Sequence, residues 1–75
     1  MSRIINLDVR PLIKDGIEPF DTIMTEVNSM DSQDQLIITA PFEPVPLEGV
    51  LSNQGFEYEV TDIGDGDFEV IFTKL

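Results

Sequence analysis

The chain has 75 residues with no cysteine and no histidine, and its 15 acidic residues against four basic ones give a formal net charge of −11. Without thiol or imidazole groups, disulfides, thiol nucleophiles and the usual ligands of haem and transition metals are excluded. The charge argues against binding to nucleic acid or to anionic membranes, because both recruit basic surfaces.

Length and hydropathy together define a single domain over residues 1–75. No run approaches the roughly 20 apolar residues of a membrane span, and the N-terminus lacks the pattern of a signal peptide. We therefore expect a cytoplasmic protein that is a monomer or a weak homo-oligomer. The acidity fits a basic partner surface, although solubility alone, including in a high-salt cytoplasm, would also explain it.

The N-terminal half is predicted to be a βαβ unit. Residues 3–9 form the first strand, because apolar and partly β-branched side chains recur there: Ile4, Ile5, Leu7 and Val9. Pro11 and Gly16 then mark irregular chain. From Pro19 to about residue 31, one-sided apolar spacing predicts an amphipathic helix. The apolar run 35–40 predicts a central strand, parallel to the first through a right-handed crossover.

The C-terminal half is predicted to contain a short helix and a hairpin. Three prolines in residues 41–46 impose extended chain, and Pro46 suits the start of a helix that Gly55 would end. Alternation of apolar and polar side chains in residues 56–73 predicts two antiparallel strands. A three-residue loop, 64–66, with Gly66 left-handed would pair Tyr58 with Phe72 and Val60 with Val70, so that one face of the hairpin is wholly apolar.

The predicted fold is therefore an α/β (α+β) two-layer sandwich of order β-α-β-α-β-β. Two singly amphipathic helices can cover only one face of the four-stranded mixed sheet, so the other face is expected to be solvated. The predicted core consists of apolar residues from both helices and three strands: Phe20, Ile23, Met24, Val27, Leu36, Ile38, Leu47, Val50, Leu51, Tyr58, Val60, Val70 and Phe72.

The joint between the first strand and the first long helix resembles a known family. Residues 7–10 (Leu-Asp-Val-Arg), a loop, Glu18-Pro19 at the helix start and Gly55-Phe56 resemble the TusA-like (SirA-like) sulfur carriers. Residues 8–12 and 40–47 resemble an uncharacterised branch, a domain of unknown function sometimes found beside hemerythrin-like domains. The resemblance implies a TusA-like fold in which a cysteine at this joint carries a persulfide. Aligned on Glu18-Pro19, that cysteine position holds Gly16.

The resemblance thus implies that the joint is retained as architecture, with Asp8 and Arg10 tying the loop to the strand end. Other chemistry finds little support, and we expect no enzyme, no cofactor and no metal. Paired carboxylates arise by chance among 15 acids. Three aspartates near two glycines (Asp62, Asp65 and Asp67) could attract calcium, but the EF-hand spacing is missing, so a hairpin turn explains them better.

The expected function is that of a small acidic, non-catalytic binding or regulatory module that acts through protein–protein interaction. The resemblance implies docking at the joint, and the possible partner-binding residues there are Asp8, Arg10, Lys14, Glu18, Pro19, Asp21 and Glu43. The alternative is an accessory protein that presents a small ligand to a redox or sulfur-metabolism enzyme.

Overall fold

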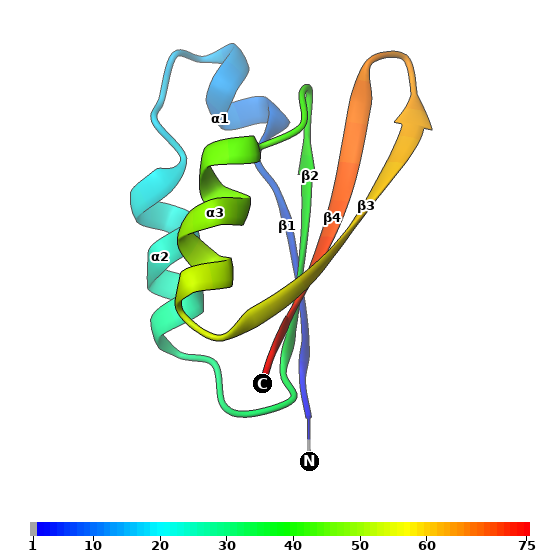
Figure 1. Ribbon diagram of the computed structural model, residues 1–75. Coiled ribbons are helices and arrows are strands. Elements are labelled where there is room, and N and C mark those ends of the chain that lie inside the picture. Colours follow the sequence, from blue (N-terminus) through cyan, green and yellow to red (C-terminus); the bar gives the residue numbers. More distant parts are fainter. Residues whose placement is uncertain (1) are drawn as a thin grey trace.

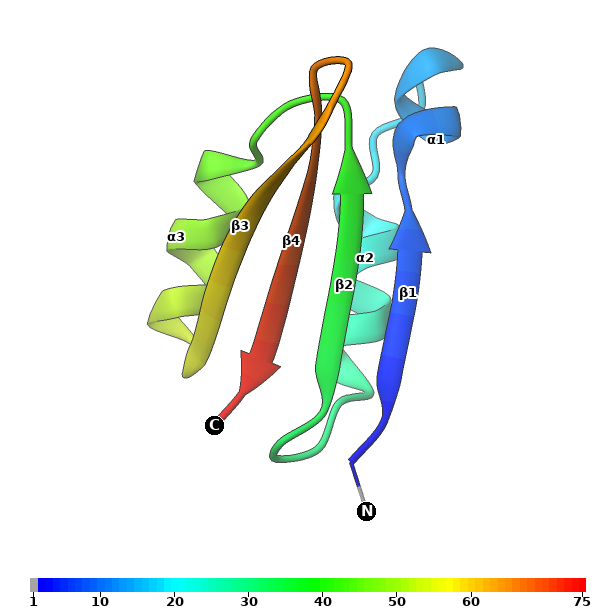
Figure 2. The same cartoon turned by 90° about the vertical axis from the view of Figure 1, so that its right-hand side faces the viewer.

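A computed structural model describes residues 2–75 as one sheet covered by helices on one face (Figure 1). The elements in chain order are β1 (Ile4–Asp8), α1 (Arg10–Lys14), α2 (Phe20–Asn28), β2 (Gln35–Ala40), α3 (Val45–Asn53), β3 (Phe56–Gly64) and β4 (Asp67–Lys74). The strand order is β1-β2-β4-β3, with β1 parallel to β2 and the other pairs antiparallel. Viewed from the open face, α2 and α3 lie behind the sheet (Figure 2). The predicted two-layer sandwich is confirmed.

The segment after β1 is the first departure from the sequence prediction. Residues expected to be irregular form the short helix α1, with Pro11 in its first turn, where the fixed φ of proline suits a helix. Asp8 Oδ1 accepts the Arg10 N–H at 3.0 Å, and the Ile13 N–H donates to the Val9 carbonyl at 3.0 Å. The turn ends at Gly16, whose φ of 75° is easily adopted by glycine.

Both long helices begin near prolines, as predicted. Pro19 precedes α2, and Pro46 lies in the first turn of α3, after which Gly55 has a φ of 88°. The α2 helix stops at Asn28 and not near residue 31. The Asp34 N–H donates to the Asp31 carbonyl, which closes a turn that contains Gln33 at a φ of 73°. Among residues 2–75, no helix is long and apolar enough to cross a membrane.

The hairpin has the predicted register but a different loop. Tyr58 pairs with Phe72 and Val60 with Val70, as expected. The predicted three-residue loop is wrong, since Gly64 pairs with Asp67 and only Asp65 and Gly66 connect the strands, with φ of 57° and 81°. A bulge at residue 63 takes up the extra residue, so a two-residue turn and the apolar register coexist.

The core lies between the sheet and α2 and α3, and most of the predicted residues contribute to it. Three predictions are wrong: Phe20 is 43% exposed, Tyr58 is 45% exposed and Val50 is also exposed. Phe20 is the first residue of α2, and Tyr58 lies on the edge strand β3, with its ring 6.0 Å from that of Phe72. Four further residues are buried in the core: Val9, Met30, Ala40 and Phe56.

Candidate functional site

An apolar groove lies at the end of the molecule where β1 runs into α1 and β2 runs into α3. We call it the joint groove; its volume is about 410 Å³. Its floor consists of buried side chains from β2, from both long helices and from the junction between β1 and α1: Val9, Ile23, Ile38, Ala40 and Leu47. The β2 strand provides the centre of this floor through alternate residues that face the helices. The site therefore depends on the two-layer packing.

Exposed apolar side chains form the rim of the joint groove. Ile17 comes from the loop before α2, Phe20 from the first turn of α2 and Phe42 from the loop before α3. Ile17 is 52% exposed and Phe42 is 47% exposed. Three prolines also line the groove: Pro19, Pro44 and Pro46. Because proline fixes φ, the segments that carry Pro19 and Pro44 at the starts of the two long helices lose little further freedom when a ligand binds.

Carboxylates lie beside this apolar surface. Of the described residues that line the groove, Glu18 alone is charged. Its Oε1 accepts the Phe20 N–H at 3.0 Å, which fixes the carboxylate at the start of α2. Asp21 is exposed in the first turn of α2, and Glu43 is exposed between two lining residues. Lys14, at the end of α1, is the basic residue of this region that remains exposed.

Asp8 and Arg10 form an ion pair, and Arg10 also contacts Asp67 in the β3–β4 hairpin. Arg10 Nε donates to Asp8 Oδ1 at 2.9 Å, Nη2 donates to Asp8 Oδ2 at 2.7 Å, and Nη1 donates to Asp67 Oδ2 at 2.7 Å. The hydrogen bonds that Arg10 donates, first to Asp8 and then to Asp67, raise the pKa of Arg10, and the Arg10 side chain lowers the pKa of Asp8. Arg10 thus bridges β1 and β4 and adds little positive charge to the groove.

The sequence predicts part of this site. It named Glu18, Pro19, Asp21 and Glu43 near the groove, while Asp8 and Arg10 form the separate bridge to Asp67. It missed Ile17 and Phe42 as rim residues, and it assigned Phe20 to the core. The only sign of Ile17 and Phe42 in the sequence is that each is an apolar residue next to glycine or proline. The sequence does not reveal that their two loops, distant in the chain, line one groove.

Glu48 is a buried carboxyl group that the sequence analysis did not identify. It lies in the first turn of α3 with 3% of its surface exposed, and its Oε2 has no hydrogen-bond partner within residues 2–75. Burial raises the pKa of Glu48, and the nearby Glu43 carboxyl raises it further. Glu48 takes a buried position on α3, whereas Val50, predicted to be buried, faces solvent.

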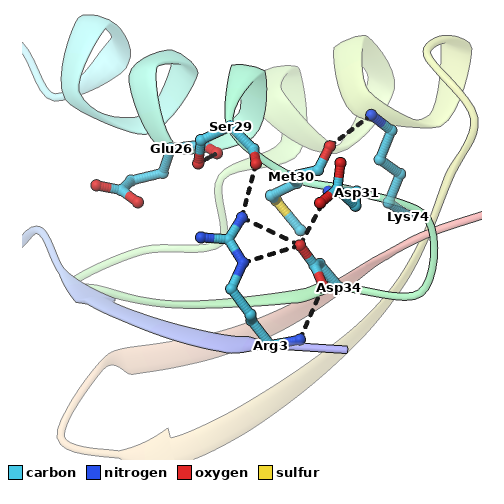
Figure 3. Close-up of polar contacts among 7 residues, drawn as sticks. All are labelled: Arg3, Glu26, Ser29, Met30, Asp31, Asp34 and Lys74. Atoms are coloured by element: carbon cyan, nitrogen blue, oxygen red, sulfur yellow. Dashed lines mark hydrogen bonds and ion pairs between the residues drawn. The ribbon is translucent and has the colours of Figure 1, made fainter. Parts of the chain in front are cut away.

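A second carboxylate, Asp34, connects the start of β1 with the segment after α2 through hydrogen bonds (Figure 3). Its Oδ1 accepts the Arg3 N–H at 2.8 Å, and its Oδ2 accepts Arg3 Nε at 3.2 Å, Arg3 Nη2 at 3.1 Å and the Asp31 N–H at 2.9 Å. The backbone donors of Asp31 and Arg3, followed by the Arg3 side chain, lower the pKa of Asp34. This cluster is enclosed by its own partners and fits a structural role.

The hairpin aspartates are placed for structure as well. Asp62 Oδ1 accepts the Gly64 N–H at 2.9 Å within the bulge, Asp65 lies in the turn, and Asp67 binds Arg10. Within residues 2–75, the acidic side chains form no cluster of three or more that could hold a metal ion.

These features define a small acidic α+β protein with an apolar groove beside carboxylates. A family model described as "Uncharacterized conserved protein (DUF2249)" matches residues 6–74, so the chain belongs to this family. The match covers all the helices and strands except for the first two residues of β1, Ile4 and Ile5. It therefore includes every residue that lines the joint groove. No curated protein and no solved structure matches the chain.

Proposed function

We propose that the protein is a non-catalytic binding or regulatory module that docks on a basic surface of a partner protein through the end that carries the joint groove. The observation that carries this proposal is the juxtaposition of exposed apolar side chains with Glu18, Asp21 and Glu43 on a chain of net charge −11. Apolar surface supplies affinity on burial, and carboxylates select a basic partner and speed the encounter.

The same proposal includes a distant relation to the TusA-like sulfur carriers, with Gly16 at the position of their cysteine. The β-α-β-α-β-β order of the main elements supports it, as does the position of Gly16 in the wall of the joint groove. Without a thiol in the chain, the joint would bind a partner and transfer no sulfur.

The test begins with affinity capture from the lysate of the source cell, followed by measured binding of the purified partner. Reversing Glu18 and Asp21 to lysine should slow association more than it speeds dissociation, because these charges mainly steer the encounter. The matched control reverses Glu57 and Glu59, which are exposed on β3 and change the net charge equally. Equal effects of both reversals, or binding that is unchanged between low and high salt, would contradict the proposal.

Presentation of a small ligand to a redox or sulfur-metabolism enzyme is the second candidate. It is favoured by the groove volume of about 410 Å³, which falls in the range of about 300–1,000 Å³ that is typical of small-molecule pockets. An amide chemical-shift titration separates the two functions. A small ligand should perturb residues of the groove alone, whereas a protein partner should perturb a broader surface around it.

A further inference from the structure

We infer that the joint groove receives a large apolar side chain from a short segment of the partner, and that lysine or arginine stands next to this side chain. The inference rests on the proposed function and specifies which part of the partner the site would take. It follows from the shape of the groove and from the positions of the charges around it, which favour a basic partner and disfavour a second copy of this chain.

The shape of the groove favours an inserted side chain over a flat contact. Ile38 and Ala40 form a floor that is at most 1% exposed, while Ile17, Phe20 and Phe42 stand above it with 43–52% exposure. An apolar side chain that entered between these rim residues would reach buried apolar atoms and would cover the rim. Anchors of this kind, seated in a pocket and surrounded by weaker contacts, provide most of the affinity in protein interfaces.

The charges determine what must flank the anchor. Glu18 lies in the wall of the groove, Asp21 lies in the first turn of α2, and Glu43 follows Phe42 directly in the chain. The positive charge of Arg10 is already shared between Asp8 and Asp67 at 2.7 Å from each. A lysine or arginine next to the anchor would meet carboxylates that form no ion pair within residues 2–75, whereas an acidic neighbour would be repelled.

The same arrangement disfavours a second copy of this chain as the occupant. Docking two copies through this end would bring the Glu18, Asp21 and Glu43 carboxylates of both molecules together on chains that each carry a net charge of −11. Like charges brought face to face across an interface repel one another, and a Debye length of roughly 8 Å at physiological salt screens this repulsion only in part.

The experiment selects ligands without assuming their sequence. Random 12-residue peptides displayed on phage are selected on the whole protein in 0.15 M sodium chloride, and the best binders are synthesised. We expect them to contain a large apolar residue beside lysine or arginine and to shift the amide signals of the groove residues. Their affinity should fall when the salt concentration is raised to 0.5 M. Binders without basic residues, binders that shift only the hairpin, or no binders at all would overturn the inference.

A pair of isoleucine variants isolates the contribution of the groove. Ile17→Ser changes a rim residue that is 52% exposed, and Ile63→Ser changes a residue in the β3 bulge that is 47% exposed and does not line the groove. The selected peptides should bind Ile17→Ser about tenfold more weakly, as for an interface anchor contact, and should bind Ile63→Ser like the wild type.

The outcomes distinguish this inference from the proposed function. In one outcome, the selected peptides bind Ile17→Ser and Ile63→Ser equally well while the reversal of Glu18 and Asp21 still slows association with the captured partner. That result would rule out the groove as the peptide-binding site and would leave the proposal of an acidic docking surface standing. If neither Ile17→Ser nor the reversal of Glu18 and Asp21 alters binding, both the inference and the proposed function fail. Far-UV circular dichroism and the unfolding midpoint of each variant show that a loss of binding is not a loss of folding.

Discussion

At the scale of single residues, the two buried carboxyl groups have opposite energetic roles. Asp34 is surrounded by donors that favour its charged form, so its pKa is lowered. Glu48 is buried, and its Oε2 has no hydrogen-bond partner in the described part of the chain. Burial first, and then the nearby Glu43 carboxyl, raise the pKa of Glu48. A lowered pKa stabilises the folded state when the group is charged, and a raised pKa does so when the group is protonated.

Replacing Glu48 by glutamine should therefore stabilise the protein at neutral pH. In the wild type, the contribution of Glu48 is fully present below its unfolded pKa of about 4.5 and is lost as the pH rises through its higher folded pKa. The amide carries no charge, so we expect Glu48→Gln to gain on the order of 1 kcal/mol at pH 7 and little at pH 4. Urea unfolding at both values measures the difference. An equal gain from Glu57→Gln, an exposed control, would contradict this explanation.

Replacing Asp34 by asparagine should have the reverse pH dependence. The contribution of Asp34 is present above its unfolded pKa of 3.8 and is lost as the pH falls through its lower folded pKa. An asparagine has a single acceptor oxygen and turns an NH₂ group toward donors. We expect Asp34→Asn to lower the midpoint of urea unfolding clearly at pH 7, and we expect the difference from the wild type to shrink as the pH falls through the lowered pKa of Asp34. Asp31→Asn, which alters a neighbouring side chain but keeps the donated N–H, should remain close to the wild type throughout.

At the scale of elements, the β3–β4 hairpin combines a bulge and a turn whose effects on register compensate each other. The Asp65-Gly66 turn alone would shift the apolar side chains of one strand relative to the other. The bulge at residue 63 restores the register and places Phe72 and Val70 in the core with no exposed surface. The positive φ at both turn residues matches what a two-residue hairpin connection with right-handed twist requires.

Gly66→Ala should consequently destabilise the hairpin through the backbone alone. A Cβ at Gly66 would meet nothing within 4 Å, but its φ of 81° is unfavourable for a residue with a side chain. We expect a loss of about 1–2 kcal/mol in the free energy of unfolding, measured in urea. Asp65→Asn is the matched change at the other turn position, where asparagine tolerates a φ of 57°, and it should be neutral or slightly stabilising. A neutral Gly66→Ala would show that the turn has another conformation.

At the scale of the whole molecule, the charge opposes the compact state. Fifteen carboxylates and four basic groups share a body with a radius of gyration of 11.7 Å. Two of those basic groups, Arg3 and Arg10, form ion pairs with Asp34, Asp8 and Asp67, so most of the other acidic side chains repel one another across the surface. Such self-repulsion favours solubility at a cost in stability.

Screening should therefore stabilise the protein. Raising sodium chloride from 10 mM to 1 M shortens the Debye length from about 30 Å to about 3 Å, so the thermal unfolding midpoint at pH 7 should rise. The Glu57→Lys/Glu59→Lys variant has less excess charge and should show a smaller rise. A midpoint that is flat or falls with salt would mean that the few ion pairs outweigh the repulsion.

The sequence by itself determined the order of the main elements, the parallel pairing of the first two strands and the hairpin register. Each depends on local periodicity or on a turn that joins neighbours in the chain, as in the apolar run of β2 and the alternation of β3 and β4. Only the tertiary structure decided what forms the joint groove, because Ile17 and Phe42 come from separate loops that line one groove once the helices have packed on the sheet. The same holds for Arg3 and Asp34, which lie 31 residues apart in the chain and meet where β1 starts beside β2. The sequence records which side chains exist, whereas their burial, exposure and pairing follow from how the helices pack on one face of the sheet.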